Sequence, residues 1–227
     1  MIEVILDTET TGLSISEKHR IIEIGCIELE NQIPTKKIFH AYINPERQVS
    51  ADAYRVHGYS NEFLKKKKIF KDISEDFLNF IKNKKIIIHN ADFDLSFLNY
   101  ELRLINKKGI DRENIIDTLK IAREKFPGAQ NSLDALCKRF NIDNSKREKH
   151  SALIDCELLK EVYINLVDQK EPKLKLESSD ILNTQSQSNN NVEQNLNISS
   201  KIIQPSKQEL ESHKKYLTSS LPKNYFN

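Results

Sequence analysis

Residues 2–12 read Ile-Glu-Val-Ile-Leu-Asp-Thr-Glu-Thr-Thr-Gly. The apolar, partly β-branched run over residues 2–6 is typical of a buried strand. Asp7 and Glu9 follow at the end of that strand, and the Thr-Thr-Gly sequence is typical of a turn. Because side chains alternate along a strand, the two carboxylates are expected to share one face. The stretch therefore predicts an acidic pair at the end of a core strand.

This acidic pair has two interpretations. Two carboxylates that point the same way repel each other, and a divalent cation would remove the repulsion. Oxygen ligands suit Mg²⁺ or Mn²⁺. The alternative is a pair of solvated acids at a strand end, with no function of their own.

The rest of the pattern places this strand in an α/β fold. Further strands are predicted over residues 21–29, 37–43, 85–88 and 114–116, with Gly25 as a possible bulge in the second. Helices are predicted over residues 50–56, 72–82, about 93–102, directly after Asp117, 133–140 and 152–167. Three consecutive strands, followed by alternating helices and strands, predict a mixed five-stranded sheet flanked by helices.

The apolar periodicity ends near residue 168, which divides the chain into three parts. Residues 1–168 are expected to form one domain. Residues 169–200 include a Gln/Ser/Asn tract and are expected to be a disordered polar linker, and residues 201–227 regain some apolar pattern. We interpret the last part as a docking segment at the end of a flexible tail. A tail without any partner is the alternative.

Composition excludes several classes of protein. The net charge is +2, and residues 1–168 carry 27 basic and 27 acidic residues. The domain therefore lacks the basic surplus of a protein that grips long duplex DNA by its phosphates. Three scattered cysteines suggest neither a disulfide framework nor a zinc site. With no signal peptide and no apolar span long enough for a bilayer, we expect a cytoplasmic protein away from membranes.

Two further clusters add candidate functional residues. Asp94 is expected in the first turn of the helix after the fourth strand, where helix capping alone would also explain an acid. Asp92 competes for that explanation, and we interpret it as an exposed N-cap. His150 and Asp155 form a His-x4-Asp pattern at the start of the last helix. Histidine titrates near neutral pH, so His150 is a candidate general base.

Together these residues predict metal-dependent hydrolysis of a phosphodiester. Asp7, Glu9, Asp94 and Asp155 would hold two divalent ions, and His150 would take the proton from the attacking water. A nucleoside monophosphate would leave from the end of the strand. The ions would also supply the positive charge that the composition lacks.

Three segments resemble, in order, the three motifs of the DEDDh exonuclease family: residues 6–12, 89–94 and 150–155. The resemblance covers about residues 1–168 and implies a ribonuclease H-like fold with 3′→5′ exonuclease activity. Further stretches are most similar to the proofreading members of the family that serve bacterial replicative DNA polymerases: residues 21–25, 56–58, 126–128, 131–137 and 142–147.

The resemblance assigns roles by position. It implies metal binding by Asp7, Glu9, Asp94 and Asp155, with His150 as the base. It implies that the 3′-terminal nucleotide is contacted by Asp7, Glu9, Thr10, Thr11, Gly12, Leu13, Asp52, His57 and Asp155. Asp52 is one methylene shorter than the glutamate expected there. His89 is interpreted as structural, and Asp117 as the cap of the helix that follows it.

The resemblance also implies partners. These are DNA with a single-stranded or frayed 3′ end, and the polymerase alpha subunit, which the tail would bind. A small theta-like subunit and the sliding clamp are further candidates, although residues 170–180 contain no clear clamp-binding box. One alternative function is RNA trimming, because metal ions do not read the sugar. Another is a non-catalytic scaffold, whose expected mark is the loss of an acid; here all five positions are filled.

Overall fold

The computed structural model describes residues 1–145, 147, 149–168 and 205–219. The chain divides into two compact units, Met1–Lys173 and Leu174–Asn227. The first contains the sheet and helices α1 to α7. The second contains α8 (Lys207–Ser219), whose described side chains are exposed. The predicted linker over residues 169–200 lies outside the described residues, as does most of the docking segment apart from α8.

The sheet is mixed and five-stranded, as predicted. Its strands are β1 (Ile2–Thr10), β2 (Ile21–Glu30), β3 (Ile33–Tyr42), β4 (Lys85–Ile88) and β5 (Ile115–Asp117). The spatial order is β3-β2-β1-β4-β5, with β1 in the centre. The first three strands form an antiparallel meander, and β4 and β5 add in parallel to β1.

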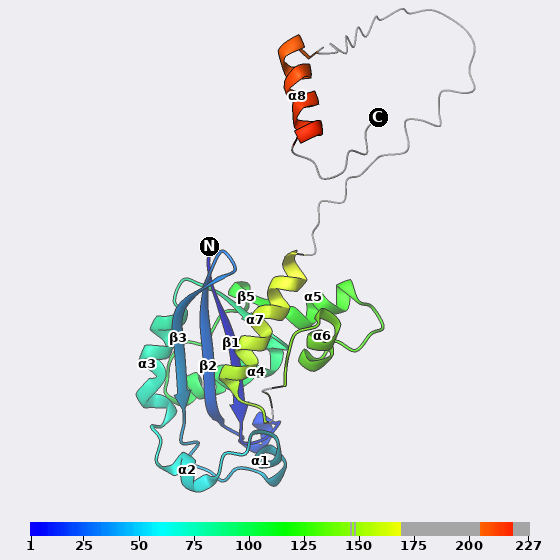
Figure 1. Ribbon diagram of the computed structural model, residues 1–227. Helices are drawn as coiled ribbons and strands as arrows, with labels where there is room; N and C mark the ends of the chain where they lie inside the picture. The colour runs from blue at the N-terminus through cyan, green and yellow to red at the C-terminus, as the bar shows by residue number, and fades with distance from the viewer. Residues whose placement is uncertain (146, 148, 169–204, 220–227) are drawn as a thin grey trace, which may run out of the picture. The chain divides into compact units, whose positions relative to one another are not determined.

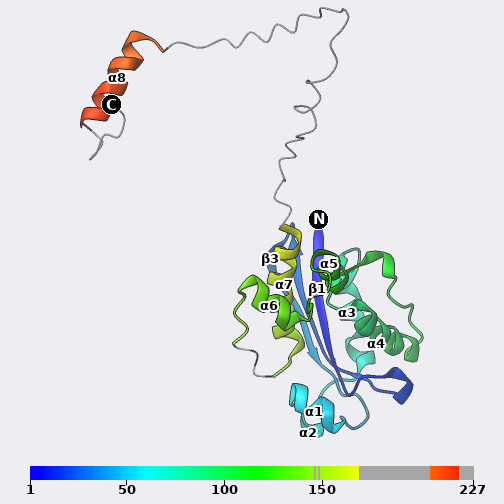
Figure 2. The same cartoon turned by 90° about the vertical axis from the view of Figure 1, so that its right-hand side faces the viewer.

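Helices cover both faces of the sheet (Figures 1 and 2). On one face, α3 (Phe70–Ile81) and α4 (Ala91–Leu104) pack against the even-numbered residues of β1, such as Val4. On the other face, α7 (Ala152–Asp168) packs against Ile5 and its neighbours. Helices α5 (Thr118–Lys125) and α6 (Leu133–Phe140) pack on α7. The odd-numbered residues of β1, Asp7 and Glu9 included, therefore face α7.

The short helices begin and end where the sequence places their caps. Helix α1 (Ala51–His57) starts at Ser50, whose side chain accepts a hydrogen bond from the backbone of Ala53, and it ends at Gly58 with a φ of 76°. Asp117 caps α5 by accepting from the backbone of Leu119. Helix α2 (Asn61–Lys65) was not predicted, because five residues carry too little periodicity.

Several predicted details are wrong. Strand β1 extends to Thr10, so its acids lie inside the strand, and β3 begins at residue 33 instead of 37. Gly25 is not a bulge: it pairs regularly with Asp7, and the irregularities lie elsewhere in β2. A Cβ at Gly25 would lie 2.6 Å from the carbonyl carbon of Ala152, so this glycine lets α7 approach the strand. The N-cap of α4 is Asn90, and Asp92 is instead an exposed first-turn acid.

Two further features of the described residues concern the cysteines and the helices. All three cysteines are free and buried. Within the described ranges, no helix is long and apolar enough to cross a bilayer.

Candidate active site

The predicted acids meet at the carboxyl end of the parallel strands. A cleft of about 1150 Å³ opens there, between the end of β1, the starts of α4 and α7, and helix α1. Ligand sites of open α/β sheets lie at this end of the strands. The residues singled out from the sequence that line the cleft are Asp7, Glu9, Thr10, Gly12, Leu13, Asp52, His57, His89, Asp94, His150 and Asp155.

Three side chains form the centre of the cluster. Glu9, His150 and Asp155 each offer a candidate ligand atom, and the three atoms lie within 4.8 Å of one another. Glu9 comes from β1, and the other two come from the start of α7, which packs on the same face of the sheet. The face predicted for the acidic pair therefore brings it to the His-x4-Asp segment.

Asp94 completes the cluster from the other side of β1. It lies in the first turn of α4 and is 3% exposed. The hydroxyl of Thr8 donates to its carboxylate at 2.7 Å. Capping alone does not explain Asp94, because a capping acid has no need to be buried beside the end of β1.

The cluster is electrostatically unfavourable without a cation. Burial, followed by the charges of Asp94, Asp155 and Glu9, raises the pKa of Asp7 well above its usual value. Burial, followed by the charge of Asp155, raises the pKa of Glu9 to about 8. Burial also raises the pKa of Asp94 to about 7. Ionised acids held this close fit divalent metal ions, and carboxylate oxygens suit Mg²⁺ or Mn²⁺.

Arg147 is the main site residue that the sequence reasoning missed. Its Nε and Nη2 donate to the two oxygens of Asp155 at 2.6 and 2.7 Å, and its Nη1 donates to Asp134 at 2.6 Å. Burial raises the pKa of Asp155, but the hydrogen bonds from His150 and Arg147 outweigh burial and hold that pKa below its usual value. The sequence gives one indication of this role, because Arg147 lies three residues before His150. Residues 142–147 were otherwise notable only for their resemblance to the proofreading exonucleases.

His150 is held in place and still reaches the cleft. Its backbone N–H donates to the carbonyl of Val56 in α1 at 3.2 Å. Its Nδ1 lies 3.3 Å from an Asp155 oxygen and 2.8 Å from Nη2 of Arg147, and its side chain is 44% exposed. Because a guanidinium N–H can only donate, Nδ1 accepts from Arg147 in this arrangement. Nε2 gains the free lone pair of a general base when Nδ1 instead donates to Asp155.

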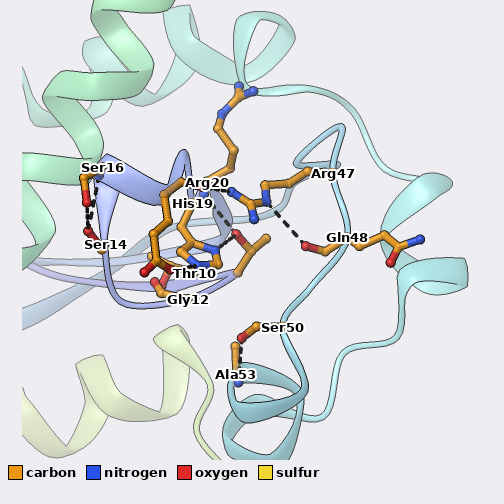
Figure 3. A network of polar contacts seen from close by, with 12 residues as sticks. Thr10, Gly12, Ser14, Ser16, His19, Arg20, Arg47, Gln48, Ser50 and Ala53 are labelled. Carbon is orange, nitrogen blue, oxygen red and sulfur yellow. Dashed lines mark hydrogen bonds and ion pairs between the residues drawn. The ribbon is translucent and has the colours of Figure 1, made fainter.

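The loop after β1 is braced by its own polar contacts (Figure 3). The hydroxyl of Thr10 donates to the carbonyl of Gly12 at 2.6 Å, and the Thr11 hydroxyl lies 2.9 Å from Nδ1 of His19. A Cβ at Gly12 would lie 2.3 Å from the His19 ring, so only glycine fits. Thr11 is fully buried and does not line the cleft, unlike its neighbours. Leu13 is 85% exposed at the rim.

His57 presents a hydrogen-bond donor without a partner. It is 3% exposed, stacks on Tyr59, and accepts a hydrogen bond at Nδ1 from the Tyr59 backbone at 2.9 Å. The proton of the neutral ring is therefore on Nε2, which has no hydrogen-bond partner among the described residues. Burial lowers the pKa of His57 to about 4, so the ring is neutral at physiological pH. Asp52 is exposed at the other end of α1 and pairs with Arg55.

The remaining candidates have structural partners. His89 Nδ1 lies 2.9 Å from the hydroxyl of Thr118, which fits its structural interpretation, although the ring also lines the cleft. Asp92 is exposed and pairs with Arg112. It therefore does not belong to the acidic cluster.

The fold is similar to those of known exonucleases. A family model described as "Exonuclease" matches residues 4–163. The nuclease domain of 3′hExo, a DEDDh family member bound to rAMP, is 19% identical with a TM-score of 0.65, covering 74% of this chain and 92% of that one. Exonuclease X in complex with DNA is 24% identical with a TM-score of 0.58 and the same coverage. These two likenesses show the fold.

Sequence relatives show which group of exonucleases this chain is most similar to. The chain is 49% identical to the DNA polymerase III subunit epsilon of Rickettsia felis, over 96% of both chains. It is 43% identical to that of Buchnera aphidicola from Acyrthosiphon pisum, over 94% of this chain and 92% of the relative. The Haemophilus influenzae subunit is 41% identical, over 95% and 89%. The chain thus belongs to the exonuclease family and, within it, to the DNA polymerase III epsilon subunits.

Proposed function

We propose that this protein is the proofreading 3′→5′ exonuclease of a bacterial DNA polymerase III, which removes mispaired 3′-terminal nucleotides as nucleoside monophosphates. The observation that carries the proposal is the convergence of Asp7, Glu9, Asp94, His150 and Asp155 on one cleft. The relatives named DNA polymerase III subunit epsilon support the replicative role. Such a role belongs in the bacterial cytoplasm, where the chromosome is.

In the proposed reaction, Asp7, Glu9, Asp94 and Asp155 would hold two divalent ions, Mg²⁺ or Mn²⁺, at the end of β1. When bound, these ions neutralise the acids, make water a stronger nucleophile and stabilise the leaving oxygen. His150 would take the proton from the attacking water through Nε2, with Nδ1 changing from accepting the Arg147 N–H to donating to Asp155. The bond between the phosphorus of the terminal nucleotide and O3′ of the penultimate nucleotide then breaks. That O3′ leaves and takes up a proton, and the terminal nucleotide is released as a nucleoside 5′-monophosphate.

The 3′-terminal nucleotide would lie between the end of β1 and α1. Neutral His57 would donate its unpartnered Nε2–H to an oxygen of the terminal sugar, a role that fits a buried donor lining the cleft. Leu13 is an apolar side chain at the rim that can contact a base. Thr10 and Gly12 would line the pocket, with Thr11 buried beneath them, and Asp52 would contact the nucleotide from the start of α1.

The partners are also proposals. The polymerase alpha subunit would bind the C-terminal segment, within which α8 is a helix with exposed side chains. A small theta-like subunit and the sliding clamp are further candidate partners. DNA with a single-stranded or frayed 3′ end is the substrate, since the cleft must receive a strand end without its complement.

Two substitutions test the active site. Asp7→Ala and His150→Ala should each lower the rate of mononucleotide release from a single-stranded oligonucleotide by at least about 100-fold, because general bases alone contribute on the order of 10²–10⁴-fold. Circular dichroism should show an intact fold. Activity like that of the wild type in a folded variant would overturn the role of that residue.

The same assay separates DNA from RNA as the substrate. Single strands of equal length and sequence, one DNA and one RNA, should be degraded side by side in Mg²⁺ and in Mn²⁺. The proposal predicts faster release from DNA. A clear preference for RNA would favour an RNA-trimming exonuclease and contradict the replicative role.

A further inference from the structure

Glu23 is a buried acid that the chemistry above does not use. It lies on β2 directly beside Glu9 of β1 and is fully buried, facing α7 like its neighbour Gly25. A buried carboxylate is costly unless several donors satisfy it. Its contacts therefore indicate what it does.

The partners of Glu23 connect the edge of the sheet to the first residues of α7. One oxygen accepts from the Ser151 hydroxyl at 3.0 Å and lies 2.7 Å from Nε2 of His40 on β3. The other accepts from the backbone N–H of Ala152 at 3.1 Å. Ala152 is the first residue of α7, and its N–H has no partner inside the helix. Glu23 thus acts as a helix cap supplied by a distant strand.

The residues that Glu23 holds lie between His150 and Asp155. Ser151 follows the histidine, and its carbonyl accepts from the backbone N–H of Asp155 at 2.8 Å, forming the first turn of α7. A shift of the helix start would therefore move both side chains relative to Glu9. A misplacement of about 1 Å in a catalytic group can cost on the order of 100-fold in rate.

We infer that Glu23 is a positioning residue for the nuclease reaction: with His40, it fixes the start of α7 so that His150 and Asp155 meet the acids of β1. This inference rests on the proposed roles of His150 and Asp155. Glu23 itself touches neither substrate nor the reacting atoms.

The substitution Glu23→Gln tests this role with little change of shape. The Ala152 N–H donates to one oxygen, and the Ser151 hydroxyl and His40 share the other. A glutamine has one acceptor oxygen, so its amide N–H₂ must either face the Ala152 N–H, which can only donate, or force Ser151 and His40 to change from donors to acceptors. The chain also offers a matched control. Glu28 is another buried acid of β2, 2% exposed, and it is satisfied by Thr35, Lys37 and Lys84 at the opposite end of the strand.

The experiment compares full-length wild type, E23Q and E28Q, all assayed below their melting temperatures. We expect E23Q to lower kcat on a single-stranded oligonucleotide at least ten-fold, with KM within three-fold. Mn²⁺ affinity, measured by titration without DNA, should weaken at least five-fold. E28Q should lower Tm by a similar or larger amount but keep kcat and Mn²⁺ affinity within two-fold. If E23Q keeps the kcat and the Mn²⁺ affinity of the wild type, Glu23 has no positioning role. The same conclusion follows if E28Q loses as much kcat and Mn²⁺ affinity as E23Q does.

Two additional variants keep the outcome decisive. Should E23Q fail to fold, Ser151→Ala removes one contact of Glu23 instead. We expect S151A to lower kcat about three-fold or more, whereas E28Q keeps kcat within two-fold. If both fold, the E23Q/S151A double variant should be no slower than E23Q, because the two act through one contact. Additive losses would contradict the inference. An inactive wild type, or an active H150A, would instead refute the proposed function.

Discussion

Glu9 shows how a single residue couples metal binding to stability. Its pKa is raised from 4.5 to about 8, mainly by burial and then by the charge of Asp155. The folded protein therefore binds a proton at Glu9 more tightly than the unfolded chain does. Between pH 4.5 and about 8 the unfolded state is ionised while the folded state is not, so stability from this group is lost as pH rises through that window.

A pH series on metal-free protein tests this coupling. In EDTA, the Tm of the wild type should fall as pH rises from 5 to 8, and Glu9→Gln should flatten the fall and raise Tm at pH 8 by a few degrees. Saturating Mn²⁺ should remove the higher Tm of the variant.

Glu28 serves as a control because its pKa is shifted in the opposite direction. Its pKa is lowered to about 2, chiefly by its hydrogen bond to Lys84, so its contribution is lost only as pH falls from about 4.5 towards 2. Equal pH profiles for wild type and E9Q would contradict the account.

Local spacing made some site residues predictable and others not. The alternation of a strand places Asp7 and Glu9 on one face, and a histidine shortly before an acid at a helix start suggests a site. Arg147 could not be found this way, because its role depends on a loop folding back onto Asp155. Thr11 shows the reverse. Its motif position suggests substrate contact, but its side chain points into the protein towards His19.

At the scale of elements, the approach of α7 to β2 determines whether the site is assembled. The sequence pattern predicts both elements, the order of the strands along the chain and most boundaries within a few residues. It does not show why Gly25 is a glycine, since a bulge and a close helix approach leave the same sequence mark. Only the packing shows that the backbone of Ala152 lies where a Cβ would be.

We therefore expect Gly25→Ala to disturb the active site, although Gly25 is not among the residues that line the cleft. The added Cβ would lie 2.6 Å from backbone, which cannot rotate away, so α7 must move. Overpacking of this kind costs about 1–3 kcal/mol, and the displaced His150 should lower nuclease activity at least ten-fold. Gly109→Ala is the control, because the nearest atoms there belong to the side chain of Asn99, which does not line the cleft. Thermal melts and single-strand assays of both variants give the comparison. A fully active G25A would show that α7 tolerates the shift.

At the scale of the whole molecule, we propose that the nuclease and the C-terminal segment are separable parts. The described residues that line the cleft all lie within residues 1–168, and the predicted docking segment begins at residue 201. Composition predicts this division, because the Gln/Ser/Asn tract cannot bury a core. It cannot predict which protein the segment binds, since that depends on the surface of the partner.

Deleting residues 171–227 tests the division. The truncated protein should degrade free single-stranded DNA at the rate of the full chain, because every cleft residue is retained. It should lose co-purification with the polymerase alpha subunit. Retained co-purification would place the contact on the nuclease domain instead.

We propose that this cleft removes nucleotides from a mispaired 3′ end with the help of divalent metal ions. The most direct measurement is the release of nucleoside monophosphates from a primer–template whose 3′ terminus is either paired or mispaired, with Mg²⁺, with Mn²⁺ and with EDTA. We expect release only with a metal ion, faster from the mispaired end, and at least about 100-fold slower from H150A. Release in EDTA, cleavage from the 5′ end, or no release from any 3′ end would contradict it.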